Sequence, residues 1–177
     1  MKALWLVSFR PMGKSKKNDV YQNLFVDSVN ALDLDVTFSL TQFDEENVLD
    51  FVRKKEIKNI YNNFPKKNLP FGKKYSNKIM LNNALEQFIE NDFQYLIFSS
   101  ADIIVPDNLT NTLRNIDMEN FCSFVFPNTH FTNGLLKNSF WPHYGIDLIV
   151  FKISREKAKY FKKIIDSYDQ YDWGIIE

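Results

Sequence analysis

Nearly continuous apolar runs recur along the chain and are separated by segments with helical spacing. Such runs predict strands that are buried on both faces. The six predicted strands cover Lys2–Phe9, Asp35–Leu40, Ile57–Tyr61, Tyr95–Phe98, Phe121–Phe126 and Ile146–Phe151. Strands that alternate with helices are typical of a parallel sheet. The sequence therefore predicts an α/β fold, a three-layer α/β/α sandwich with a mostly parallel sheet in which the last strands can run antiparallel.

Apolar residues spaced three and four apart predict helices between these strands. The predicted helices cover a segment between Asp19 and Val29, Glu45–Lys55, Ser76–Glu90, a short segment after Pro106, and a last helix capped by Ser154. The segment Pro127–Gly145 has neither pattern, so it is predicted to be the longest loop. Loops of that length in compact domains are usually functional.

Composition and charge narrow the class of protein. A chain of 177 residues, 45% of them hydrophobic, predicts one domain over residues 1–177 with a substantial core. Its 22 basic and 22 acidic residues leave no net field toward nucleic acid or an anionic membrane. No apolar stretch approaches the roughly 20 residues that span a bilayer, so any membrane contact is expected to be peripheral.

The single cysteine, Cys122, cannot form an internal disulfide, which fits a reducing cytoplasm. It lies in an apolar run, where a buried small hydrophobe and a catalytic thiol are both open interpretations. The apolar run after Met1 and Lys2 is too short for a secretory signal. These features predict a cytoplasmic protein.

The stretch with the most chemistry is a helix that leads into a buried strand. The helix carries Lys78, Asn83 and Leu85, and the strand is followed by Ser99-Ser100-Ala101-Asp102-Ile103-Ile104-Val105-Pro106. Asp102 falls where a parallel sheet presents its carboxyl edge, the edge that binds ligands. A carboxylate there can hold a hard cation that neutralises a diphosphate. The alternative is that Asp102 is only a capping or turn residue.

This region resembles the GT-A type glycosyltransferases (family 2-like), which have a Rossmann-like fold. Lys78, Asn83 and Leu85 match the helix pattern of that family, and Ser100–Pro106 falls on its Asp-x-Asp segment. Ser100 stands at the first acid of the motif, and only Asp102 keeps its carboxylate. The resemblance covers most of the chain in element order, although the matching residues are confined to this part.

The resemblance implies a hexosyltransferase-like enzyme. It would transfer a sugar from a nucleoside-diphosphate donor, UDP above all, to a glycan or lipid-linked hydroxyl acceptor, with inversion. A divalent metal, manganese or magnesium, would be held weakly because the first acid is missing. The donor-binding residues that it implies are Ser8, Phe9, Arg10, Gln42, Asp44, Lys78, Ser99, Ser100 and Asp102. Arg10 suits a phosphate or a base face, but a solvated loop arginine is equally open.

The resemblance also places a general base late in the domain, beside a tryptophan. Asp172 precedes Trp173 and takes that place, with Asp169 and Glu177 as its rivals, and a solvated acidic tail is the alternative. His143 can complete the metal site with Asp102 or serve a structural role. The chain stops at Glu177, where the family continues into acceptor-binding elements. We therefore expect either a minimal protein or a fragment of a longer one.

Two other functions stay open. Residues 8–15 nearly spell a phosphate-binding P-loop after a strand, with Gly13-Lys14-Ser15 at its end, which favours an ATPase or kinase. Ser8, however, stands where that motif needs glycine. The missing first acid and the short chain favour a relative that binds a nucleotide-sugar without turnover.

Overall fold

The computed structural model describes residues 1–43, 48–64, 77–115, 121–124, 127–132, 135–142 and 147–167. Side chains are described for residues 1–42, 48–62, 78–115 and 147–167. Every statement below refers to these ranges. None of the helices within them is long and apolar enough to cross a bilayer.

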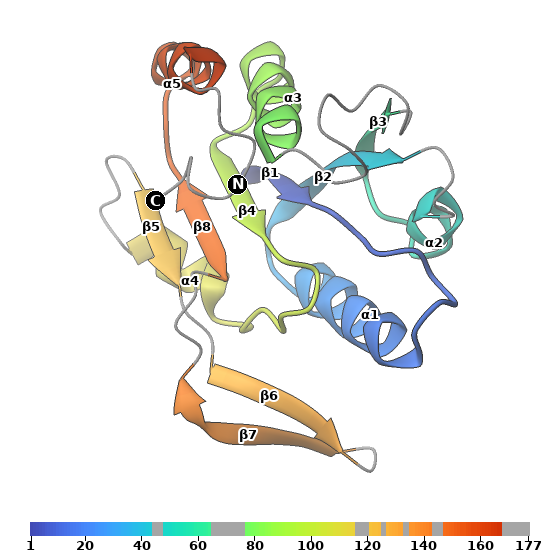
Figure 1. The fold of residues 1–177 in the computed structure, drawn as a ribbon. Helices are drawn as coiled ribbons and strands as arrows, with labels where there is room; N and C mark the ends of the chain where they lie inside the picture. The colour runs from blue at the N-terminus through green and yellow to red at the C-terminus, as the bar shows by residue number, and fades with distance from the viewer. Residues whose placement is uncertain are drawn as a thin grey trace.

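A six-stranded sheet forms the centre of the fold, in the order β3-β2-β1-β4-β8-β5 (Figure 1). Its strands are β1 (Lys2–Val7), β2 (Asp35–Phe43), β3 (Asn59–Phe64), β4 (Tyr95–Ser99), β5 (Phe121–Phe124) and β8 (Leu148–Phe151). The first four strands run parallel, whereas β8 is antiparallel to both of its neighbours, β4 and β5. The prediction of a mostly parallel sheet is confirmed, and of the two last strands in the sheet only β8 runs antiparallel, since β5 has the direction of β4.

Helices cover both faces of this sheet, as predicted. On one face lie α1 (Lys16–Asn30), α2 (Val48–Lys54) and α4 (Leu109–Asn115), and on the other lie α3 (Asn77–Glu90) and α5 (Arg155–Ser167) (Figure 1). Alternate residues of β1 serve the two faces. Trp5 and Val7 pack in the core beneath α1 and α2, while Leu4 and Leu6 pack beneath α3 and α5. Strand pleating thus divides one buried strand between two cores.

Aromatic side chains fill the core under α1 and α2. The Trp5 ring meets Phe25 edge-on at 5.9 Å between centroids, and Phe25 stacks on Phe38 at the same separation. Phe9 extends the cluster to Phe51 at 5.3 Å, although it lies beyond the last residue of β1. The predicted strand included Phe9 because it is apolar. Its burial comes instead from this ring cluster.

Two helices, α1 and α5, begin after a serine cap, as the sequence predicts for α5. Ser15 caps α1, because its side chain accepts a hydrogen bond from the Asn18 backbone N–H. Ser154 caps α5 by accepting from the Lys157 backbone N–H at 3.2 Å. In α1 the buried residues are Gln22, Phe25, Val26 and Val29, so an uncharged polar residue lies on the inner face of the helix.

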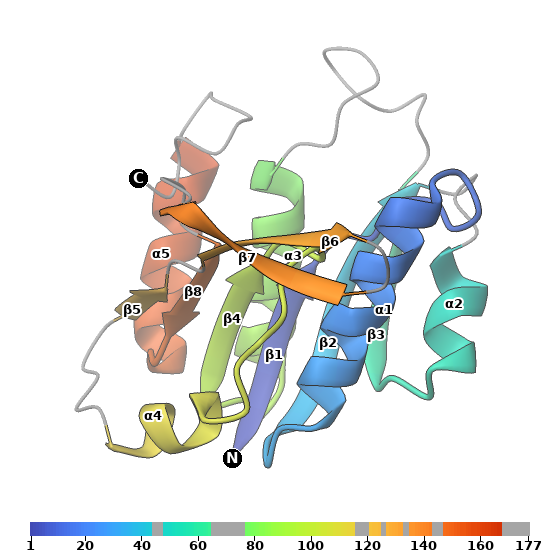
Figure 2. The same cartoon turned by 90° about the horizontal axis from the view of Figure 1, so that it is seen from below.

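The prediction of a long loop over Pro127–Gly145 is wrong. The structure places an antiparallel hairpin there, formed by β6 (Pro127–Thr132) and β7 (Leu135–Pro142). The hairpin projects from the sheet on the side that carries α1 (Figure 1). When the molecule is viewed from that side, the hairpin lies in front of the sheet (Figure 2). Asn133-Gly134 separates its strands, and that dipeptide is a strong sequence signal for a tight hairpin. The residues on either side of this dipeptide alternate only weakly between apolar and polar, so the sequence pattern did not predict the two strands.

A polar cluster joins the outer helices α3 and α5. The Asp166 carboxylate accepts from Asn82 at 2.6 Å and from the Lys162 ammonium at 3.1 Å, and Lys162 also pairs with Glu86 at 3.2 Å. The hydrogen bond from Lys162 holds the pKa of Asp166 below its usual range. Asp166 in turn raises the pKa of Lys162, and Glu86 contributes.

This cluster predicts an acid-dependent loss of stability in one variant. Because the folded pKa of Asp166 lies below its unfolded value, its stabilisation is complete above that unfolded value and disappears as pH falls through the folded pKa. Asp166→Asn should therefore lower the free energy of unfolding by about 0.5 kcal/mol at neutral pH, and the difference should vanish in acid. Urea denaturation across a pH series measures both effects.

Glu90→Gln is the matched control on α3, since Glu90 is exposed and outside the cluster. It should leave the free energy of unfolding unchanged at every pH. A deficit in Asp166→Asn that persists unchanged in acid would show that the loss is not electrostatic.

Candidate functional site

The order of the strands creates a switch point between β1 and β4. From β1 the chain moves outward through β2 and β3, and then returns to β4 on the other side of β1. The segments that leave β1 and β4 therefore diverge at the carboxyl edge of the sheet. Open α/β sheets bind their ligands in the crevice that such a divergence produces.

A pocket lies at this switch point. Its lining residues come from the segment after β1, from the first turns of α1 and from the segment after β4. They are Ser8, Arg10, Asn18, Gln22, Ser100, Ala101 and Asp102. The pocket is open to solvent and offers a volume of about 40 Å³. This is far below the roughly 300–1,000 Å³ of typical small-molecule sites, so the described residues form only a small part of a ligand site.

A glutamine from β2 fixes the backbone of Phe9, which lies between the lining residues Ser8 and Arg10. The Gln42 side chain accepts from the Phe9 backbone N–H at 3.0 Å and donates to the Phe9 carbonyl at 3.1 Å. Gln42 is fully buried. Since its amide satisfies both backbone groups of Phe9, the chain stays hydrogen-bonded two residues beyond the end of β1.

A second glutamine, from α1, does the same for the next residue. The Gln22 side chain accepts from the Arg10 backbone N–H and donates to the Arg10 carbonyl at 3.2 Å. Gln22 is 2% exposed and lines the pocket. The Arg10 guanidinium is free to extend along the surface, where it donates to the Asn18 side chain at 3.3 Å. The wall therefore combines a fixed backbone with an exposed cation.

The opposite wall comes from the segment after β4. Ser99 is buried, and its hydroxyl accepts from the Trp5 indole N–H at 2.8 Å, which ties β4 to the core of β1. The exposed Ser100 hydroxyl donates to the Asp102 carboxylate. Serine at position 100 therefore supports the remaining acid of the segment, instead of supplying a second carboxylate.

The loop before α1 closes on its own helix. The Gly13 backbone N–H points at both carboxylate oxygens of Asp19, each at 3.1 Å, with Gly13 at a φ of 80° that favours glycine. A P-loop would direct such an N–H at a phosphate. Here a carboxylate of the protein holds that position, and this arrangement argues against the P-loop interpretation.

The structure brings four of the predicted donor-binding residues together in this pocket: Ser8, Arg10, Ser100 and Asp102. Three others, Phe9, Gln42 and Ser99, are buried behind its walls and support them. Lys78 lies elsewhere, at the start of α3, where its ammonium donates to the Asp166 carbonyl on α5 at 3.1 Å. Asp44, His143, Asp169 and Asp172 lie outside the described residues, and so does the side chain of Cys122.

Two polar lining residues were not predicted, Asn18 and Gln22. They lie four residues apart on α1, so they share the helix face that the pocket borders. A glutamine within the apolar stripe of a helix was the available signal, because a buried amide needs partners. Its partners belong to a different segment, which helical periodicity does not identify.

The donor set for a metal ion is small. Within the described residues, no three His, Cys, Asp or Glu side chains come together. Asp102 is the acidic residue of the pocket lining, and Ser100 already donates to it. These groups do not fit a cation held by protein alone. They fit one held jointly with phosphate oxygens, which is how Mg²⁺ usually binds.

Comparison with solved structures identifies the fold. It resembles a protein assigned as a nucleotide-diphospho-sugar transferase from Desulfovibrio desulfuricans, with a TM-score of 0.53, 14% identity, and coverage of 95% of this chain and 68% of that one. It also resembles a 4-diphosphocytidyl-2C-methyl-D-erythritol synthase from Anaerococcus prevotii, with a TM-score of 0.53, 9% identity, and coverage of 97% of this chain and 78% of that one. A third match is the bifunctional IspDF from Campylobacter jejuni, with a TM-score of 0.51, 13% identity, and coverage of 97% of this chain and 45% of that one.

No family profile and no characterised protein matches the sequence itself. At the low identities of the structural matches, the likeness establishes the fold alone. The chain therefore has an α/β fold that is similar to the folds of these solved structures.

The hydrogen bonds between Gln42 and the Phe9 backbone predict a large loss of stability when the Gln42 amide is removed. Gln42→Leu keeps the side-chain bulk but leaves the Phe9 N–H and carbonyl buried without partners. Each unsatisfied group costs about 1–3 kcal/mol, so the variant should lose at least about 2 kcal/mol of unfolding free energy. Chemical denaturation of the variant and the parent measures the loss.

Ser39→Ala is the matched control on the same strand. The Ser39 hydroxyl is buried and has no hydrogen-bond partner among the described residues, so its removal should be neutral or stabilising. Equal losses of unfolding free energy in both variants would show that any substitution in β2 is destabilising. The loss in Gln42→Leu could then not be attributed to the hydrogen bonds at Phe9.

Proposed function

We propose that this protein is a glycosyltransferase that binds a nucleoside-diphosphate sugar, with uridine diphosphate as the nucleotide, in the pocket between β1 and β4. The observation that carries the proposal is the position of the pocket, at the switch point of a sheet of the nucleotide-diphospho-sugar transferase type. The pocket is lined by hydroxyl, amide, guanidinium and carboxylate groups, which suit a polar, anionic ligand.

The diphosphate would lie against Arg10. A guanidinium forms paired hydrogen bonds with phosphate oxygens, and charge-assisted bonds of this kind are about twice as strong as neutral ones. The hydroxyls of Ser8 and Ser100 and the Asn18 amide can bind the ribose or the base. The backbone under Arg10 is already fixed by Gln22, so little order must be gained on binding.

Asp102 would hold a divalent cation together with the diphosphate. The cation would neutralise the charge that develops on the leaving nucleotide. With one carboxylate in the described part of the pocket, we expect metal affinity to be weak until the nucleotide is present.

For the transfer step, we propose Asp172 as the general base that takes the proton of the acceptor hydroxyl, with Asp169 as its rival. The support is the resemblance of the sequence around Trp173, and inversion by direct displacement needs only one positioned base. The acceptor would be a glycan or a lipid-linked alcohol. His143 is proposed as a further metal ligand on the same basis.

Nucleotidyl transfer is a second candidate, favoured by the structural match to a 4-diphosphocytidyl-2C-methyl-D-erythritol synthase. The products distinguish the two reactions. A glycosyltransferase releases UDP from a UDP-sugar, whereas a nucleotidyltransferase releases pyrophosphate from CTP. Binding of UDP with neither product would identify a nucleotide-sugar-binding protein without turnover.

The proposal predicts that UDP binding depends on Arg10. Arg10→Ala should weaken the affinity about 10–100-fold, since it removes charge-assisted hydrogen bonds to the diphosphate. Isothermal calorimetry with UDP, with and without manganese, measures the change. Arg114→Ala is the control, because Arg114 lies on α4 in an exposed ion pair with Asp33 and should not alter binding. Absence of UDP binding by the parent under both conditions would exclude this donor.

The proposal also predicts opposite metal responses for two substitutions. Asp102→Asn should abolish the gain in UDP affinity that manganese gives, because the carboxylate ligand is lost. Ser100→Asp should increase that gain by placing a second anionic oxygen beside Asp102. Asp107→Asn, an exposed acid outside the pocket lining, should respond like the parent. Identical manganese responses in all four proteins would reduce Asp102 to a turn residue.

A further inference from the structure

Two large hydrophobic side chains are exposed in the described part of the chain, and both lie on α5. Tyr160 is 68% exposed and Ile164 is 37% exposed. Residues four apart lie side by side on a helix, so the two form one outward strip. The opposite face of α5, with Ala158 and Ile165, is already buried in the core beneath α3 and α5. The strip is therefore additional to the face that packs in the fold.

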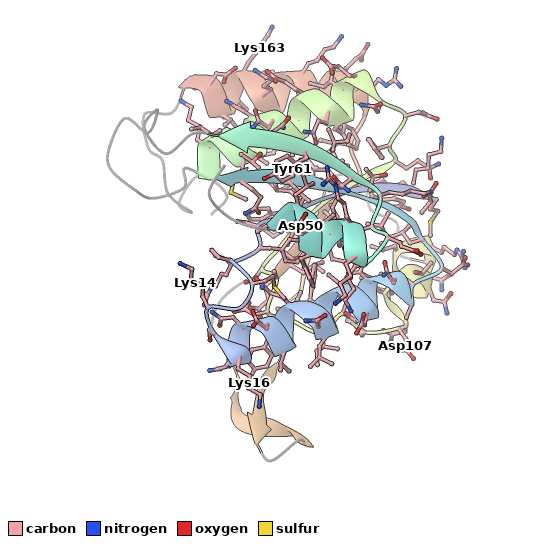
Figure 3. All side chains as sticks on the ribbon, turned by 90° about the vertical axis from the view of Figure 1, so that its right-hand side faces the viewer. Lys14, Lys16, Asp50, Tyr61, Asp107 and Lys163 are labelled. Carbon is pink, nitrogen blue, oxygen red and sulfur yellow. The ribbon has the colours of Figure 1, made fainter. Side chains whose placement is uncertain are left out.

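Lysines accompany this strip. Lys159 and Lys163 precede its two members by one residue each, and Lys157 lies three residues, about one turn, before Tyr160. All three are exposed, and Lys163 extends from α5 away from the rest of the molecule (Figure 3). With the exposed Glu156, the outward face carries three positive charges and one negative charge, a net charge of +2. The neighbouring charges of Arg155, Lys162 and Asp166 are engaged in the contacts of α5 with α3 and the turn after it.

We propose that this outward face of α5 docks on an anionic lipid surface. Lysine stems can lie along the apolar region while their ammonium groups meet lipid phosphates, and tyrosine prefers the boundary between headgroups and hydrocarbon. A bilayer needs no groove, which suits the convex surface of a single helix. A second copy of the chain fits less well, because a two-fold contact would place the same lysines against one another.

The orientation of α5 relates this face to the pocket. Because β8 is antiparallel to β4, the helix that follows it runs in the direction of β4. The Asp166 carbonyl near its end meets Lys78 at the start of α3, the end of that helix opposite to the one that leads into β4. Ile164 and Lys163 therefore lie toward the carboxyl edge of the sheet. Docking through α5 would turn the sheet face that carries α3 and α5 toward the lipid surface, with the carboxyl edge at the side of the contact.

Vesicle co-sedimentation tests the docking without any assay of sugar transfer, so its result is independent of the proposed function. We expect the protein to sediment with vesicles in which about a third of the lipid is phosphatidylglycerol, and not with pure phosphatidylcholine. Binding should fall steeply between low salt and about 0.5 M salt. Failure to bind the anionic vesicles, or equal binding to both kinds, would overturn the proposal.

Variants identify the face. Lys159→Gln with Lys163→Gln should lower the partition coefficient about 30-fold, since each lysine near an anionic surface contributes a factor of about five. Tyr160→Ser with Ile164→Ser should weaken binding at least about fivefold without a change of charge. The control is Arg53→Gln with Lys54→Gln, an equal charge change on α2 across the sheet, which should bind like the parent.

An equal loss in the α2 control would show general charge attraction and overturn the assignment to α5. Binding of polyglutamate with no binding of anionic vesicles would indicate an acidic protein partner, and would also overturn it. Circular dichroism and thermal melting of each variant establish that the fold is retained, since all the substituted side chains are exposed.

Discussion

The candidate site depends on the pairing of two glutamine side chains with the backbone after β1. A primary amide offers the same donor and acceptor as a peptide group, so Gln42 and Gln22 replace the strand that Phe9 and Arg10 lack. Both amides come from segments that the sheet and α1 hold in place. A buried backbone without these partners would carry the full cost of desolvation, and the chain would have to leave the core earlier.

This pairing explains how a polar pocket can lie directly on an aromatic core. The Phe9 ring packs against Phe25, Phe38 and Phe51 while the backbone of the same residue is held by Gln42. The next residue, Arg10, points outward from that anchor. Under the opposite wall, the Ser99 hydroxyl accepts a hydrogen bond from the Trp5 indole N–H, which holds the end of β4 against the core. The groups that would meet a ligand are therefore mounted on rigid neighbours, which is the arrangement that favours binding without reorganisation.

The sequence predicted the layers and half of the pocket for the same physical reason. Strands buried on both faces are apolar throughout, and parallel strands end at one edge, so Ser8, Arg10, Ser100 and Asp102 could be placed together. The supporting roles of Gln42 and Gln22 could not be predicted, because each depends on a partner in a distant segment. Lys78 was assigned through a motif, but its ammonium meets α5, a helix that no local pattern relates to it.

The single antiparallel strand β8 has a consequence for how this architecture can diversify. Since β5 and β4 both oppose β8 in direction, the chain leaves β5 and enters β8 at the same edge, the one that bears the pocket. The β6–β7 hairpin thus belongs to an insertion whose two ends are anchored side by side. Such an insertion can lengthen, shorten or change its sequence while the register of the sheet stays intact. Changes in the insertion would therefore alter the surface beside the pocket without moving the segments after β1 and β4 that line it.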